Sequence, residues 1–271
     1  MRRALPIALV LAACEPNLTP PGDRDGGPAV FECLPDLDGV LHARELPLAF
    51  DLPVDYLVSP EGTPIDLAGA VDEAGRRVWD YAAESAADQR LATRAVRLRS
   101  QWYALDFPGA ELVVPALGAT ELDGVYSLDE AGFWLHGLAS PEENPPTGHT
   151  LLVYDEPVAL LRFPLAPGDR WIETAAVSGG TLDGLPYNGT DTYEIEDDAL
   201  GRVELPFVSF TQAHRVRTHV TVAPAAGGVT SSRHQTSFFF ECFGEVARAT
   251  SRAGEPSANF TIAAEVRRLS L

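Results

Sequence analysis

Lysine is absent from this 271-residue sequence, and all 20 of its basic residues are arginine. The absence excludes a Schiff-base lysine and the lysine of a phosphate-binding loop. The 39 acidic residues outnumber the arginines, and the formal net charge of -19 argues against nucleic acid and anionic lipid surfaces as partners. An arginine-only set of basic residues, together with many Ala, Gly and Pro residues, indicates a GC-rich genome.

Catalytic motifs are lacking as well. The sequence contains neither the His-Glu-x-x-His pattern of zinc proteases nor the Gly-x-Ser-x-Gly elbow of serine hydrolases. His214 and His219 are five residues apart, so on one strand they would face opposite sides and could not share a metal ion. We therefore predict no enzyme activity, no catalytic residue, no metal site and no cofactor. All six histidines are interpreted as strand-surface or core residues: His42, His136, His149, His214, His219 and His234.

Two acidic segments resemble ligand sites only superficially. Asp23 and Asp25 form a fragment of a calcium loop, which needs further acids at alternating positions and a distal Glu. In the run 194–198, Glu194 and Glu196 share a parity opposite Ile195, which predicts a solvated strand face that ends in a turn. Neither segment is predicted to bind a ligand.

The N-terminus has the pattern of an export signal. Two arginines precede an apolar run of about ten residues, which is too short to span a hydrocarbon core of about 30 Å. The run ends in Leu11-Ala12-Ala13-Cys14, which resembles the lipobox of bacterial lipoproteins. The resemblance implies cleavage after residue 13, diacylglyceryl and palmitoyl-type acylation of Cys14, and a lipid anchor in the bacterial cell envelope. Glu15, in place of Asp, favours the outer membrane over the inner one; the alternative is a buried cysteine behind an ordinary signal.

The expected organisation of the chain follows from this processing. Residues 1–13 are the predicted signal peptide, and 14–32 the lipidated cysteine with a flexible tether rich in Pro and Gly. Residues 33–271 are predicted to form a single β-rich domain, with a possible seam near 108–120. At 45% hydrophobic residues, the chain can bury a sizeable core.

Cysteine is rare, with only three residues in the chain. Lipid on Cys14 would leave Cys33 and Cys242 in an oxidising compartment, so we predict a disulfide between them. On the chain-entropy model, closing so long a loop would stabilise the fold by roughly 5 kcal/mol. The alternative is two buried free thiols.

Period-two alternation dominates the rest of the sequence and predicts a mainly β fold. The turns Asp-Glu-Ala-Gly at 72–75 and 129–132 each end in a glycine suited to a left-handed hairpin position, and the second should join 125–128 to 133–139. Three sets of alternating residues are predicted to form strand faces: Val216, Thr218, Val220 and Val222; Phe238, Phe240 and Cys242; and Phe260, Ile262, Ala264 and Val266.

One segment has a helical pattern. Over 86–101 and the following Trp102, Leu91, Ala95 and Leu98 recur at helical spacing among good helix formers, and we predict one helix there. In the competing interpretation, Val96, Leu98 and Trp102 form one face of a strand.

Three segments carry a further resemblance, to envelope lipoproteins of unknown function from GC-rich bacteria such as myxobacteria. These are the Phe-Pro-Leu-x-x-Gly-x-x-Trp pattern at 163–171, the element at 203–216 (with Phe207-Val208-Ser209 where the family has Ala-Gly-Thr), and Gly-x-Val-x-Arg at 244–248. The resemblance implies an antiparallel sheet curled into a half-open barrel, similar to the Lol lipoprotein carriers, with an apolar concave face that a helix often covers. Independently of the family, Pro164, Gly168 and Trp171 are interpreted as a turn and an aromatic that closes the core.

Two functions are compatible with these features. The first is a non-enzymatic module that binds a lipid or another apolar ligand on the curled sheet, motivated by the resemblance and by aromatic faces such as Phe238 and Phe240. The alternative is a structural or assembly accessory that docks an envelope protein through its acidic surface.

Overall fold

A computed structural model describes residues 33–46, 48–115, 122–225 and 227–270, and 33–271 form one compact unit. The predicted signal peptide 1–13, the lipidated Cys14 and the tether to residue 32 lie outside the described residues. Within the described part of the chain, no helix has the length and apolar character needed to cross a membrane.

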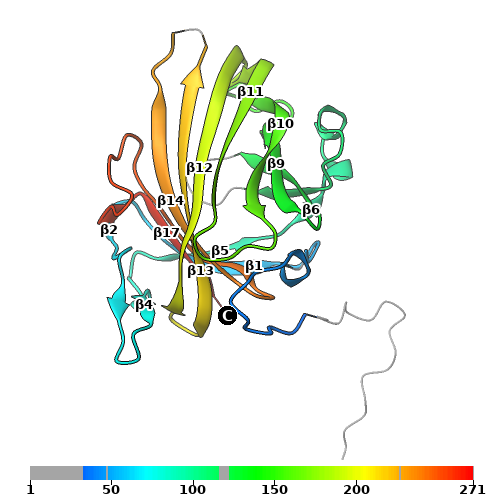
Figure 1. The fold of residues 1–271 in the computed structure, drawn as a ribbon. Helices are drawn as coiled ribbons and strands as arrows, with labels where there is room; N and C mark the ends of the chain where they lie inside the picture. Colours follow the sequence, from blue (N-terminus) through cyan, green and yellow to red (C-terminus); the bar gives the residue numbers. More distant parts are fainter. Residues whose placement is uncertain (1–32, 47, 116–121, 226, 271) are drawn as a thin grey trace, which may run out of the picture. The chain divides into compact units, whose positions relative to one another are not determined.

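The described residues form strands and three short 3-10 helices (Figure 1). The strands are β1 (Val54–Ser59), β2 (Thr63–Pro64), β3 (Ala70–Val71), β4 (Arg77–Asp80), β5 (Gln89–Thr93), β6 (Val96–Arg97), β7 (Leu112–Pro115), β8 (Asp123–Leu128), β9 (Gly132–Ala139), β10 (Leu151–Arg162), β11 (Arg170–Leu182), β12 (Leu185–Glu204), β13 (Ser209–Pro224), β14 (Ser231–Phe240), β15 (Gly244–Thr250), β16 (Ile262–Ala263) and β17 (Glu265–Ser270). The 3-10 helices are η1 (Ala43–Glu45), η2 (Leu98–Ser100) and η3 (Ala104–Asp106).

One large sheet contains most of these strands, in the order β5-β1-β17-β15-β14-β13-β12-β11-β10-β9-β8-β7-β6. Neighbours in this order are antiparallel, while β4 joins the far end of β12 in parallel over 201–204. The two end strands β5 and β6 are not paired with each other, although only residues 94 and 95 separate them in the chain. The predicted mainly β, antiparallel fold is therefore confirmed, and the sheet is not closed.

The curl of the sheet follows from contacts between strands that are distant in its order. Tyr126 on β8 lies within electrostatic range of Arg248 on β15, although six strands separate β8 from β15 in the sheet. Such an approach requires the sheet to bend around one face, which we call the concave face. That face carries Trp171, Ile195 and Val216, and these pack with residues of β9 and β10 in one apolar cluster.

Several local predictions are confirmed. The predicted hairpin at 129–132 joins β8 to β9, and Trp171 is buried and donates its indole N–H to the Ala159 carbonyl at 2.7 Å. Gly75 has the expected left-handed conformation at φ +79°, whereas Gly132 does not. The alternation from Phe260 to Val266 is wrong as a single strand, because the chain breaks between β16 and β17 and leaves Ile262 exposed.

The helix predicted over 86–101 is wrong. The segment forms β5, β6 and the 3-10 helix η2, and Leu91 pairs with Tyr56 of β1. Leu91 and Leu98, which shared the helical stripe, pack in two different apolar clusters. The strand interpretation holds only for Val96, because Leu98 lies in η2 and Trp102 in the turn that follows, although all three pack in one apolar cluster. Edge pairing with β1 outweighs the helix propensity of the segment.

The aromatic face of β14 is covered by the chain itself. Phe238 is fully buried beneath Trp79 and Tyr81, with ring centroids at 4.9 and 5.5 Å. Both rings come from the segment around β4, at the foot of the long strands (Figure 1). Phe238 and Phe240 are therefore core residues and offer no surface to an apolar ligand.

The predicted disulfide between Cys33 and Cys242 is confirmed, with the Cα atoms 5.5 Å apart across 209 residues of sequence. It fastens the start of the described chain to the turn between β14 and β15. Cys242 also donates its backbone N–H to the Glu45 carbonyl at 2.7 Å, so the same turn holds η1.

Candidate binding site on the concave face

A pocket of about 580 Å³ opens on the concave face where β1 and β5 meet β14 and β17. Val58 and Leu91 line it as apolar residues, while Arg233 and Glu265 bring charge. Leu91 of β5 lies opposite Tyr56 of β1, so these two side chains share a face of the sheet. Val58 is two residues after Tyr56 on β1 and therefore lies on the same face. The complete lining is Val58, Ser59, Pro60, Glu61, Ala87, Gln89, Leu91, Arg233, Arg252, Ala253, Ala264 and Glu265.

The arginine on β14 is exposed and unpaired. Within the described residues, Arg233 makes no hydrogen bond and no ion pair, and its charge acts on the nearby Glu265. At the rim, Arg252 pairs with Glu61 at 2.7 Å, and both side chains are more than half exposed. The pocket therefore offers a guanidinium that no carboxylate in the described part of the chain neutralises by direct contact.

A charged cluster lies beside the pocket on the same face. Glu245 of β15 forms ion pairs with Arg248, at 2.6 Å, and with Arg267 of β17. The three side chains keep 11 to 28% of their surface exposed. Burial acts to raise the pKa of Glu245, but Arg248 and Arg267 outweigh it and the pKa is lowered. Two arginines thus share one ionised carboxylate.

Two tyrosines flank this cluster. Tyr56 donates its hydroxyl to the Glu245 carbonyl at 3.0 Å, and the Arg267 guanidinium lies 5.6 Å from its ring centroid. Burial raises the pKa of Tyr56 to about 12, so the phenol stays neutral. Burial also raises the pKa of Tyr126, which approaches from β8.

Glu265 connects the pocket with the cluster. Its neighbours include Arg267, Arg248, Glu245 and Arg233. Burial raises its pKa, and although the arginines oppose this effect, the net shift is upward. Glu265 therefore lies within electrostatic reach of both the pocket arginine and the cluster.

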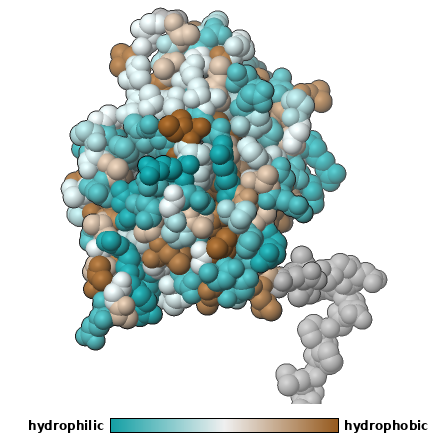
Figure 2. All heavy atoms as spheres, viewed as in Figure 1, coloured by the Kyte–Doolittle hydropathy of each residue, from teal (hydrophilic) through white to brown (hydrophobic). Residues whose placement is uncertain are grey.

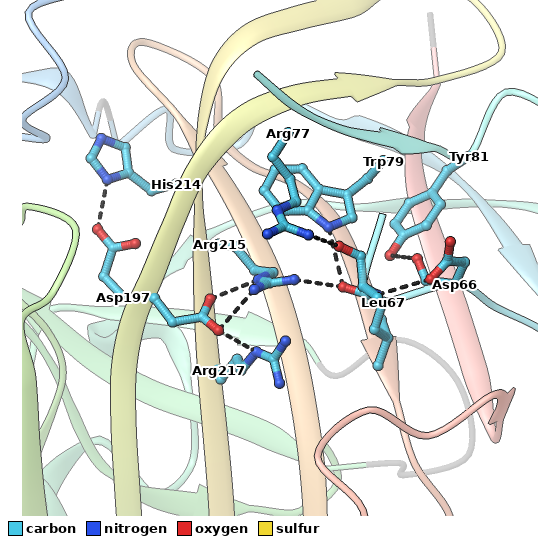
Figure 3. A network of polar contacts seen from close by, with 11 residues as sticks. Asp66, Leu67, Arg77, Trp79, Tyr81, Asp197, His214, Arg215 and Arg217 are labelled. Atoms are coloured by element: carbon cyan, nitrogen blue, oxygen red, sulfur yellow. Dashed lines mark hydrogen bonds and ion pairs between the residues drawn. The ribbon is translucent and has the colours of Figure 1, made fainter. Parts of the chain in front are cut away.

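A second polar network lies near the junction of β4, β12 and β13 (Figure 3). Arg215 donates two hydrogen bonds to Asp198, at 2.6 and 2.8 Å, and one to the Leu67 carbonyl. Its guanidinium also lies 5.0 Å from the ring centroid of Trp79. Arg217 approaches Asp198 to 2.7 Å. All three nitrogen atoms of the Arg215 guanidinium already donate to Asp198 or to the Leu67 carbonyl. This network therefore fastens β4 to the sheet and does not present a free site.

Next to this network, Asp197 and His214 form a fully buried pair (Figure 3). His214 Nδ1 lies 2.7 Å from the Asp197 carboxylate, and burial raises the pKa of Asp197. The second nitrogen of His214 and the second oxygen of Asp197 have no hydrogen-bond partner among the described residues. Neither side chain reaches a surface, so the pair has no access to a substrate.

A serine–histidine contact occurs elsewhere, between Ser127 of β8 and His136 Nε2 of β9 at 2.8 Å. Burial lowers the pKa of His136. Within the described residues, no carboxylate bonds to His136, so the orienting acid of a catalytic triad is missing from this contact.

The structure also gives the positions of the histidines and of the acidic run 194–198. His214 is buried and His219 is half-buried on the opposite face, stacked on His234 at 4.3 Å. Glu194 and Glu196 are exposed as predicted. The predicted turn after 194–198 is wrong, because β12 continues through a bulge to residue 204 and buries Asp197.

The charged concave cluster was not predicted. Its members lie on β15 and β17, and the pairing of those strands sets Arg248 opposite Arg267. Strict alternation would place Glu245 and Arg248 on opposite faces of β15, because they are three residues apart. A bulge in the pairing of β15 with β14 brings them to one face, and only the sheet order shows that this face is the concave one.

The surface in view in Figure 2 carries hydrophobic residues in separate small groups among hydrophilic ones. Exposed large hydrophobic residues are correspondingly scattered over the sequence, for example Leu105, Leu185 and Val229. Comparison with known protein families, with curated proteins and with solved structures finds no match for this chain, and its resemblance to envelope lipoproteins stays a prediction from sequence.

Proposed function

We propose that this protein is a lipid-anchored, non-enzymatic binding module of the bacterial cell envelope whose pocket holds an amphipathic ligand with an acidic group. The anchor rests on the Leu11-Ala12-Ala13-Cys14 motif, with the outer membrane favoured by Glu15. The ligand site rests on the concave pocket described above.

The observation that carries the proposal is the combination of an unpaired guanidinium with apolar lining. Val58 and Leu91 can pack on a hydrocarbon segment, and Arg233 can pair with a carboxylate or phosphate at its end. A volume of about 580 Å³ lies within the usual range of roughly 300–1,000 Å³ for ligand clefts. The surplus of arginine in the adjacent cluster adds favourable potential for an anion.

This proposal narrows the ligand expected from sequence. A purely apolar ligand would need an open apolar interior. On the concave face, however, Trp171, Ile195 and Val216 are buried in a packed apolar cluster. The accessible part is charged. An acyl chain alone would not use the Arg233 guanidinium, whereas a ligand with an acidic end can pair with it.

The test is a titration of the full chain with an environment-sensitive fluorescent fatty acid and with its neutral methyl ester. We expect the acid to bind and the ester to bind at least tenfold more weakly. Arg233→Ala should weaken binding of the acid by a similar factor, and Leu91→Gln should weaken both probes. Arg170→Ala, an exposed arginine of β11 outside the pocket, is the matched control. Equal binding of acid and ester, or no effect of Arg233→Ala, would contradict the proposal.

An assembly accessory is the second candidate, and the filled core and net charge of -19 favour it. It predicts that crosslinking in cells captures one envelope protein repeatedly, and that substituting exposed acids abolishes capture while Arg233→Ala does not.

A further inference from the structure

The loop that follows Cys33 carries a cluster of carboxylates outside the pocket. One ligand oxygen each from Asp36, Asp38 and Glu241 lies within 4.8 Å of the others. Asp36 and Asp38 are exposed, whereas Glu241 is 1% exposed at the end of β14. We propose that these three residues form a calcium-binding site that joins the N-terminal loop to the β14–β15 turn.

Glu241 is the residue that points to a cation. One of its carboxylate oxygens accepts the Leu37 N–H at 2.9 Å, while Oε1 is buried without any hydrogen-bond partner. Within the described residues, no arginine or histidine pairs with Glu241. A buried carboxylate without compensation is costly, and a bound cation supplies both the charge and the missing contact.

The backbone of the loop directs the two aspartates toward Glu241. Leu37 and Gly39 have left-handed conformations, at φ +55° and +84°, so the chain turns sharply around Asp38. Asp36 accepts the Asp38 N–H at 3.2 Å, and Asp38 accepts the Val40 N–H at 2.8 Å through Oδ1. These hydrogen bonds order both side chains and leave Asp38 Oδ2 available as a ligand.

The chemistry of the donors selects the metal. All three ligands are carboxylate oxygens, the donors that calcium prefers, and neither sulfur nor imidazole nitrogen is present to favour zinc. Calcium–oxygen distances of about 2.4 Å allow two ligands of one ion to be up to about 4.8 Å apart. The exposed side of the cluster leaves room for water molecules to complete a coordination number of about 6 to 8.

The site would reinforce a connection that already exists. Cys33 precedes Asp36 by three residues and Cys242 follows Glu241 directly, so the disulfide and the ion would tie the same two segments. Arg44 lies 3.3 Å from Asp36 and offsets part of the negative charge. The inference is independent of the concave pocket, which involves none of these residues.

Isothermal titration of the full chain with calcium, after removal of metal by a chelator, tests the inference. We expect one ion per chain with sub-millimolar affinity, and a thermal unfolding midpoint that rises with calcium and falls back with EDTA. Glu241→Gln and Asp38→Asn should each weaken binding at least tenfold. If Glu241→Gln does not fold, Asp38→Asn carries the test, because Asp38 is exposed and asparagine can still accept the Val40 N–H.

Glu142→Gln and Glu143→Gln, which remove two exposed acids elsewhere, are the matched controls and should bind calcium like the unmodified chain. Absence of binding at about 10 mM calcium would overturn the inference, since this lies above the usual range for extracellular modules. Unchanged binding in Asp38→Asn would overturn the assignment to these residues. Magnesium bound at the same residues as tightly as calcium would overturn the choice of metal.

Discussion

Arg267 and Arg268 are neighbours on β17 and point to opposite faces of the sheet, and their surroundings differ accordingly. Arg268 has its side chain 4% exposed and donates to the Ser59 hydroxyl, to the Asp88 carboxylate and to the carbonyls of Tyr81 and Ala83. These acceptors lie on β1 and on the segment from 81 to 88, so one guanidinium holds several parts of the chain together.

On the concave face, Arg267 has far fewer partners. It pairs with Glu245, which it shares with Arg248, and lies over the ring of Tyr56. Burial of an arginine therefore does not by itself distinguish a structural role from a role in binding. An arginine that donates to several acceptors within the protein, such as Arg268, has a structural role. Arginines that outnumber the carboxylates beside a pocket favour the binding of an anionic ligand there.

The largest effect should follow from Arg268→Leu. The substitution removes the positive charge that pairs with the buried Asp88 carboxylate and the donor of the Tyr81 and Ala83 carbonyls, and we expect a loss of about 3–5 kcal/mol of unfolding free energy. Urea denaturation measures it, with Arg170→Leu on the surface as the control, expected to change stability by less than about 0.5 kcal/mol. A loss below about 1 kcal/mol would show that the two faces of β17 do not differ in this way.

The acid side of the same contact gives a pH dependence. Burial acts to raise the pKa of Asp88, but hydrogen bonds from Ser59, Ser85 and Arg268 outweigh it and the pKa is lowered. Its stabilising contribution is therefore complete above the unfolded pKa of about 4 and is lost as pH falls through the folded value. Asp88→Asn should cost about 2–3 kcal/mol at neutral pH, because it removes charged hydrogen bonds.

As pH falls from about 4 through the lowered folded pKa of Asp88, the stabilities of Asp88→Asn and the unmodified chain should approach each other. Urea denaturation at a series of pH values from neutral to about pH 3 measures this, and Asp106→Asn at an exposed position is the control. Parallel curves for Asp88→Asn and the unmodified chain would contradict a lowered pKa at Asp88.

Arg267→Leu should have a smaller effect on stability. Glu245 keeps its ion pair with Arg248 at 2.6 Å, so we expect a loss of about 1–2 kcal/mol. The same substitution reduces the positive potential beside the pocket and should weaken binding of the fluorescent fatty acid several-fold. A stability loss as large as that of Arg268→Leu, without any change in binding, would assign Arg267 a structural role.

How far the sequence predicts this arrangement depends on whether a feature is local. Period-two alternation and the hairpin at 129–132 predict the antiparallel sheet, and counting cysteines predicts the bond between Cys33 and Cys242. Asp183-Gly184, with φ of +49° and +76°, is a further local hairpin signal in the sequence. Asp36-x-Asp38-Gly39 is a local pattern of another kind, with two carboxylates beside a turn. The third carboxylate of that cluster comes from residue 241 and is not local.

The non-local features could not be predicted. The segment 86–101 has a helical pattern, yet the pairing of β5 with β1 decides its structure. Likewise, Arg267 and Arg268 are equivalent in sequence, and only the curl of the sheet distinguishes the concave face from the other. The burial of Phe238 depends on β4, which is about 160 residues earlier in the chain. In each case the deciding contact joins segments far apart in sequence, where no short pattern records it.

The smallest effect on stability is expected for Arg252→Ala at the rim of the pocket. The ion pair with Glu61 is exposed on both sides and should contribute less than about 1 kcal/mol. The loss of fatty-acid binding should nevertheless be measurable, because Arg252 lines the pocket and attracts its anionic group. Arg76→Ala removes an arginine of similar exposure that pairs with Asp72 outside this pocket; it is the matched control and should leave binding unchanged. If both variants bind alike, the ligand contacts of the pocket are limited to Arg233 and the concave cluster, and the rim only shapes the entrance.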